Sequence, residues 1–89
     1  MSKVVVLTGA GGVLCSELAF AFSKNNFKVA VLDLNEKAAH KIVNTINSKG
    51  GNAIAISANV LDKESLENAK HIINKEFGLC DILINGAGG

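Results

Sequence analysis

Short apolar runs alternate along this chain with longer stretches of mixed polarity. Four runs, at 3–8, 27–33, 52–57 and 81–85, are rich in Val, Ile, Leu and Ala. Continuous apolar runs of this length are typical of parallel strands, because helices cover both faces of the sheet that such strands form. The pattern therefore predicts four parallel β-strands joined by three helices.

The stretches between these runs repeat their apolar residues at helical spacing. We expect helices from 12 to 25, from the N-cap residue Asn35 to Gly50, and from the N-cap residue Asp62 to Gly78. Asn and Asp side chains accept hydrogen bonds from free N–H groups at a helix start, and glycine is favoured just beyond a helix end. The expected buried faces are Leu14, Leu18, Ala21 and Phe22, then Ala38, Ile42 and Ile46, then Leu66, Ala69, Ile73 and Phe77.

The handedness of the connections fixes how these elements are arranged. Crossovers between parallel strands are right-handed, so strands one to three run outward with helices one and two on one face. The next connection doubles back, which places helix three on the opposite face and strand four beside strand one. We therefore predict an α/β, Rossmann-like, doubly wound parallel sheet with strand order 3-2-1-4. In such sheets a ligand binds beyond the carboxyl ends of the strands, where the strand order reverses.

A glycine-rich turn lies at that point. It follows the first strand and leads directly into the first helix, so free backbone N–H groups are available to a phosphate. Glycine lets the backbone turn sharply and approach a ligand without a Cβ in the way. A turn of this kind can also be a plain connection between a strand and a helix, so other features have to decide whether it binds a nucleotide. The candidate cofactor-binding residues here are Thr8, Gly9, Gly11, Gly12, Val13 and Leu14.

Two further candidates follow the second and third strands. Asp33 ends the second strand, at the spacing where a carboxylate accepts both ribose hydroxyls of an adenosine. That charge repels a 2′-phosphate, and Leu34 and Asn35 offer no cation to neutralise it, so NAD is expected rather than NADP. Asn59 and Val60 are placed to reach an adenine edge. The alternatives are that Asp33 caps the second helix and that Asn59 is a plain turn residue.

Small residues follow the fourth strand as well. Asn85 can tie this strand to its neighbour, and Gly86, Ala87 and Gly88 allow a ligand to approach closely. The two small-residue turns converge on the point where the strand order reverses. This convergence is the main reason to predict a dinucleotide site.

Composition narrows the class of protein further. The net charge of +1, with acids and bases interspersed, indicates neither a nucleic-acid nor an anionic-membrane partner. No apolar segment near the N-terminus is long enough for a signal peptide or a membrane span, and we expect a cytoplasmic protein. Cys15 and Cys80 lack metal-ligand spacing and are expected to be small buried residues, and no metal site is predicted. His40 and His71 are expected to be solvated.

Taken together, these motifs resemble the short-chain dehydrogenases/reductases. Residues 8–15 fall on the family's TGxxxGxG turn, and residues 85–88 on its NNAG motif. Asp33 matches the acidic residue of NAD-preferring members, and Asn59 and Val60 match the Asp-Val pair that contacts adenine. The resemblance implies hydride transfer between NAD and an alcohol or ketone. The variants TGxGGVL and NGAGG also resemble the D-mannonate (fructuronate) oxidoreductases, which act on sugar acids.

The sequence departs from the family pattern at several positions. Val13 and Cys15 replace the second and third glycines of the turn, Asn59 replaces Asp, and Gly86 replaces Asn. A side chain at 13 narrows the approach to a pyrophosphate, and one at 15 pushes the first helix away from the sheet. The adjacent pair Gly11-Gly12 can restore that room.

The family's catalytic residues have no counterpart in this sequence. Its chemistry requires a Ser and a Tyr-x-x-x-Lys pair, and this chain contains no Tyr. We therefore predict that residues 1–89 are the N-terminal, NAD(P)-binding portion of a longer enzyme, inactive alone and of marginal stability. The substrate, a small molecule, would bind through the missing part, and we expect a homo-oligomer.

Two other functions remain open at this point. The chain could be a non-catalytic nucleotide-binding or assembly module that functions at this length. Strand four would then be an edge, with uncovered apolar surface on the sheet face away from helix three. An S-adenosylmethionine-binding fold shares the glycine turn and the acidic end of strand two, but fits the turn at 85–88 less well.

Overall fold

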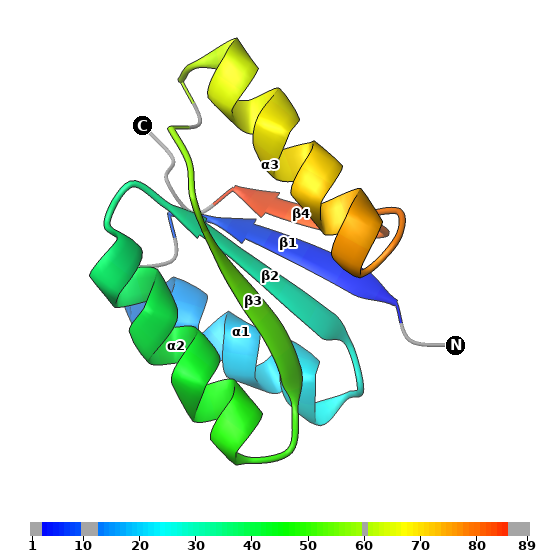
Figure 1. Ribbon diagram of the computed structural model, residues 1–89. Coiled ribbons are helices and arrows are strands. Elements are labelled where there is room, and N and C mark those ends of the chain that lie inside the picture. Colours follow the sequence, from blue (N-terminus) through cyan, green and yellow to red (C-terminus); the bar gives the residue numbers. More distant parts are fainter. Residues whose placement is uncertain (1–2, 10–12, 60, 86–89) are drawn as a thin grey trace.

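The computed structural model describes residues 3–9, 13–59 and 61–85, with the side chains of 13–15 excepted. Strands and helices alternate strictly through these ranges (Figure 1). All the elements predicted from the sequence are present, each within a few residues of its expected limits. They are β1 (Val4–Thr8), α1 (Val13–Lys24), β2 (Lys28–Asp33), α2 (Glu36–Ser48), β3 (Asn52–Ser57), α3 (Lys63–Glu76) and β4 (Ile82–Asn85).

The strands form one parallel sheet in the order β3-β2-β1-β4, which confirms the predicted topology. At the carboxyl end of β1, Thr8 is paired with Leu32 of β2 on one side and with Asn85 of β4 on the other. Helices α1 and α2 cover one face of the sheet, and α3 covers the other (Figure 1). This is a doubly wound α/β fold, and its strand order reverses between β1 and β4.

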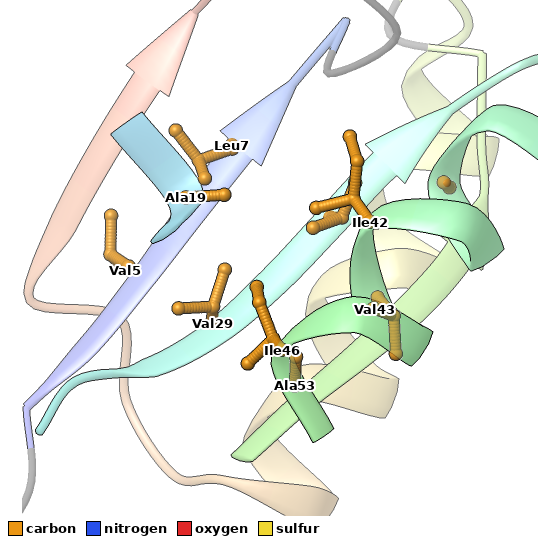
Figure 2. Packing of buried hydrophobic residues seen from close by; sticks show 10 residues of the cluster. Val5, Leu7, Ala19, Val29, Ile42, Val43, Ile46 and Ala53 are labelled. Carbon is orange, nitrogen blue, oxygen red and sulfur yellow. The ribbon is translucent and has the colours of Figure 1, made fainter. Parts of the chain in front are cut away.

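The face covered by α1 and α2 holds the larger part of the core (Figure 2). Val5 and Leu7 of β1 are fully buried there, against Ala19 of α1 and Ile46 of α2. The prediction that Ala21 lies on the buried face of α1 is wrong, because Ala21 is exposed and Ala19 is buried. Apolar residues occur on several sides of α1, so their spacing alone does not select the side that meets the sheet. A methyl group at 19 lets the helix approach β1 closely.

The face covered by α3 is smaller. Ala69 and Ile73 are buried against Val4 and Val6 of β1, as the helical spacing predicts. Leu66 and Phe77, the other members of the predicted stripe, are half-buried and pack against the same cluster.

The helix ends also follow the predictions. The side chain of Asn35 accepts a hydrogen bond from the N–H of Ala38 at 3.2 Å, and Asp62 accepts one from the N–H of Glu64 at 3.0 Å. Gly50 and Gly78 end the second and third helices with φ of 85° and 101°, a conformation that strains any residue with a Cβ.

Strand β4 forms an edge of the described sheet and is only partly covered. Ile82 and Ile84 are half-buried against the α1 and α2 side, whereas Leu83 is 63% exposed. Leu83 pairs in register with Val6, whose side chain belongs to the α3 face. The expectation of uncovered apolar surface on the face away from helix three is therefore wrong. The uncovered residue lies on the α3 face, where the buried residues of α3 cluster with residues of β1, β2 and β3 and with none of β4.

The cysteine prediction also needs correction. Cys80 is exposed in the loop before β4, where its thiol donates a hydrogen bond to the carbonyl of Ile82. This loop lies outside the strands and helices, and its Cys80 side chain belongs to neither core cluster. The side chain of Cys15 lies outside the described residues. His40 and His71 are exposed, as expected.

Candidate functional site

The carboxyl ends of the four strands meet along one edge of the sheet (Figure 1). Polar or small residues stand at or just beyond these ends: Thr8 and Gly9, Asp33, Asn59, and Asn85. The side chains reach this edge because the strands are parallel and their register is continuous. Every strand therefore ends at the same edge, and Asn59 lies two residues beyond the end of β3.

The glycine turn begins at a fixed point between β1 and β2. The N–H of Gly9 donates to the carbonyl of Leu32 at 2.9 Å, and Gly9 has a φ of 65°. A left-handed residue here redirects the chain from β1 toward α1, which begins at Val13. Of the other predicted turn residues, Gly11 and Gly12 lie outside the described residues, as do the side chains of Val13 and Leu14.

Asp33 stands immediately beside this turn. Its carboxylate Oδ1 accepts a hydrogen bond from the N–H of Asn35 at 3.0 Å, and the residue is half-buried. The alternative that Asp33 caps the second helix is wrong, because Asn35 is the N-cap residue. The bond from Asn35 instead holds the carboxylate beyond the end of β2, next to the residue that anchors Gly9. Leu34, between these two residues, is 69% exposed.

Asn59 is held in a turn of its own. Its side-chain oxygen accepts a hydrogen bond from the N–H of Leu61 at 3.0 Å, and its backbone N–H donates to the Ser65 hydroxyl at 3.0 Å. These bonds are those of a turn residue, the alternative that the sequence left open for Asn59. Ser65 was not singled out from the sequence, since a serine in the first turn of a helix gives no signal of a bond to the preceding loop. Val60 lies outside the described residues.

On the other side of β1, Thr8 and Asn85 join two strands. The buried Thr8 hydroxyl donates to the side-chain oxygen of Asn85 at 3.0 Å. Asn85 thus ties β4 to β1 through a hydrogen bond between two side chains. Gly86, Ala87 and Gly88, the rest of the predicted turn, lie outside the described residues.

A cavity of about 290 Å³ opens below this edge, between α3 and the sheet. Its lining includes the polar residues Thr8 and Asn85 and the apolar residues Leu66, Ile73 and Leu83. The described residues hold no cluster of three or more His, Cys, Asp or Glu suited to a metal ion. Within the same ranges, no helix is long and apolar enough to cross a membrane.

Fold and site together define a class of protein. A doubly wound parallel sheet, with a left-handed glycine after its first strand and a fixed carboxylate after its second, is the arrangement of a Rossmann-like dinucleotide-binding domain. The model of the short chain dehydrogenase family matches residues 3–89, which is nearly the whole chain. The chain belongs to that family.

Known relatives agree with this assignment. An uncharacterized oxidoreductase of Haemophilus influenzae is 49% identical over 88 residues, covering 99% of this chain and 31% of the relative. A solved Haemophilus structure with bound NAD, described provisionally as a D-mannonate oxidoreductase, has 49% identity and a TM-score of 0.94 over 98% of this chain and 31% of its own. The 7α-hydroxysteroid dehydrogenase of Escherichia coli K12 is 33% identical over 98% of this chain and 34% of that enzyme. The chain thus spans about a third of the length of these relatives.

Proposed function

We propose that this chain is the NAD-binding portion of an oxidoreductase that transfers hydride between NAD and an alcohol or ketone. The observation that carries the proposal is the Asp33 carboxylate, held by the Asn35 N–H beside the Gly9 turn. Family membership and a 49% identical structure with bound NAD support it. Because the chain spans a third of its relatives, the oxidoreductase activity is proposed for a protein that includes the remaining part.

The described residues fit a dinucleotide in charge and shape. Gly9 offers no Cβ where a pyrophosphate would approach, and the start of α1 directs free N–H groups to the same side. The Asp33 carboxylate would accept the ribose hydroxyls. The Thr8–Asn85 bond would keep β1 and β4 at a fixed spacing beneath the ligand. The cofactor itself would supply the hydride acceptor.

We propose NAD rather than NADP as the cofactor. A 2′-phosphate on the adenosine ribose would lie against the Asp33 carboxylate, and like charges at such short range repel. The next residues, Leu34 and Asn35, carry no positive charge that would offset this repulsion.

The catalytic groups are proposed to lie in the part that the relatives contain beyond the matched third, since this sequence has no Tyr. We propose a sugar acid as the substrate, on the similarity to the Haemophilus protein described provisionally as a D-mannonate oxidoreductase. A chimera of residues 1–89 with the remaining part of that protein tests the first statement, because the substrate site of the chimera is that protein's own. We expect the chimera, unlike residues 1–89 alone, to oxidise the substrate of that protein with NAD. A folded chimera that binds NAD and stays inactive where the intact relative is active would contradict the proposed division between cofactor-binding and catalytic parts.

A conservative charge change tests the cofactor site itself. Asp33→Asn keeps an oxygen that accepts the Asn35 N–H but removes the charge that would bind the ribose. Hydrogen bonds to charged groups contribute about 1.5–3 kcal/mol, so NAD affinity should fall about 10- to 100-fold. The preference for NAD over NADP should shrink as well, and calorimetric titration measures both.

Glu36→Gln is the matched control for this variant. It removes one exposed carboxylate three residues away, outside the proposed site. A general charge effect would weaken NAD binding equally in both variants, and that result would contradict the role given to Asp33.

A further inference from the structure

We infer that the α3–β4 cavity, the space of about 290 Å³ between α3 and the sheet, couples the remaining part of the protein to the NAD site. An amphipathic helix of that part, with a carboxylate opposite Lys70, would occupy the cavity and strengthen NAD binding. The inference rests on the proposed function and extends it, because it concerns how the NAD affinity of the same site is set.

The α3–β4 cavity is elongated along both elements. On the sheet it extends from Cys80, in the loop before β4, to Asn85 at the end of that strand. Five residue steps of extended chain span about 16 Å, which is about three turns of a helix. On the helix, its lining comes from one face of α3, with residues spaced by four, three and one: Leu66, Lys70, Ile73 and Asn74. A groove of this length beside a helix fits a second helix.

Exposed apolar side chains surround this cavity. Leu61 and Leu83 line it and are 92% and 63% exposed, and Leu79, the neighbour of Cys80, is 80% exposed. Exposed apolar side chains gathered in one place mark a surface that another protein segment covers. The occupant therefore needs an apolar side.

The occupant also has to complement one positive charge. Lys70 is the only charged residue among the described residues that line the cavity. Its ammonium group favours a carboxylate on the occupant, because a charge at a buried apolar surface is costly unless it is paired. A second copy of this chain is a poorer occupant of the cavity. In a two-fold contact the same patch meets itself, which brings one Lys70 toward the other.

The remaining part of the protein can supply such a helix. α3 lies on its face of the sheet because the crossover from β3 to β4 is right-handed. A further right-handed crossover, from β4 to a parallel strand beyond it, runs in the same direction and lies on the same face. The relatives are about three times as long as this chain, so a protein of their length has the residues for that crossover. Its helix would lie beside α3, over β4.

Thr8 and Asn85 link this cavity to the NAD site. Both residues line the cavity, and the Thr8 hydroxyl donates to the Asn85 side chain at 3.0 Å, at the carboxyl edge of the sheet. Within the described sheet β4 pairs with β1 alone, and none of its described residues is fully buried. A helix over Leu83 would hold β4 against β1 and so keep Asn85 in place beneath the ligand. Two partners that favour the same arrangement of one strand strengthen each other's binding.

Lys70→Glu tests the coupling in the chimera of residues 1–89 with the remaining part of the Haemophilus protein. We expect the Cys80 thiol to react more slowly with iodoacetamide in the chimera than in the 89-residue chain, and Lys70→Glu to restore the faster reaction. Mass spectrometry of the peptide that contains Cys80 separates this thiol from others. In calorimetric titration, Lys70→Glu should weaken NAD binding to the chimera about fivefold, the lower end of ordinary coupling between sites. The same substitution in the 89-residue chain should have no such effect.

Lys75→Glu is the matched control, because it makes the same charge change at an exposed position of α3 outside the cavity. Equal weakening of NAD binding by the two substitutions would reflect net charge alone and overturn the inference. Equal reaction rates of Cys80 in the chimera and in the 89-residue chain, or an NAD affinity of the chimera unchanged by Lys70→Glu, would overturn it as well. These outcomes leave the proposed function standing. If neither protein binds NAD, the proposed function fails too.

Discussion

At the scale of single residues, the site depends on polar side chains whose hydrogen bonds are made within the fold. Thr8 is the one buried polar residue described, and its hydroxyl bonds to Asn85 across two strands that are 77 residues apart in sequence. The Asp33 carboxylate and the Asn59 amide are held by backbone N–H groups two residues further on. Both kinds of bond fix a polar group at the carboxyl edge of the sheet.

Thr8→Val tests the link between β1 and β4. Valine has nearly the shape of threonine but lacks the hydroxyl, so the variant loses the bond to Asn85 and gains no cavity. We expect the free energy of unfolding to fall by about 1 kcal/mol, measured by urea denaturation.

Thr45→Val is its control. The Thr45 hydroxyl bonds to the carbonyl of Lys41 one turn earlier in α2, which is a local bond within one helix. Replacing it should change stability by only a few tenths of a kcal/mol. Equal losses in the two variants would mean that Thr8 contributes no more than a local bond.

At the scale of elements, the two edges of the described sheet differ in how they are shielded from pairing with other chains. On the β3 edge, the Asn47 side chain donates to the carbonyl of Ala53 at 3.2 Å and accepts from the N–H of Ala53 at 2.9 Å. By pairing with both the N–H and the carbonyl of Ala53, the Asn47 amide takes the place of a neighbouring strand. It thereby shields this edge from pairing with other chains. On the β4 edge, the described side chains instead include the exposed Leu83.

Asn47→Ala should therefore lower stability and expose the β3 edge. The N–H and the carbonyl of Ala53 each lose a partner, and we expect a loss of about 1–2 kcal/mol in the free energy of unfolding. Static light scattering should also detect more aggregation. Asn44→Ala, at an exposed position of the same helix, is the control. Alanine favours helices, so a comparable loss in the control would contradict the role of Asn47.

At the scale of the whole molecule, a small sheet encloses a small core. The buried apolar residues lie on β1, β2 and β3 and on the helices above and below them, whereas β4 has no fully buried residue among those described. Domains of this size bury a smaller share of their surface than larger ones do. We therefore expect a stability near the lower end of the usual range, and association through the apolar edge at β4.

Leu83→Lys tests that association. A lysine at this exposed edge position opposes pairing between chains, and charged residues on edge strands are a common natural device against it. We expect size-exclusion chromatography with light scattering to show less association for this variant than for the unchanged chain. Leu34→Lys, at an exposed leucine beyond β2, is the control. Equal association of the unchanged chain and Leu83→Lys would show that another surface mediates it.

The sequence alone determined the elements, their order in the sheet and the edge where the candidate site lies. Runs such as Val4–Thr8 indicate buried strands, Asn35 and Asp62 indicate helix starts, and handedness converts that order into a topology. These inferences succeed because each depends on neighbours in sequence or on a rule that holds for nearly every fold.

Only the tertiary structure decided which side of each element is buried and which groups meet. Ala19 rather than Ala21 faces the sheet, and Leu83 is exposed on the α3 face. The bond between Thr8 and Asn85 joins strands that are distant in sequence. The physical reason is that the spacing of apolar residues shows which residues share a face of an element. Only packing against a particular neighbouring element selects the face that is buried.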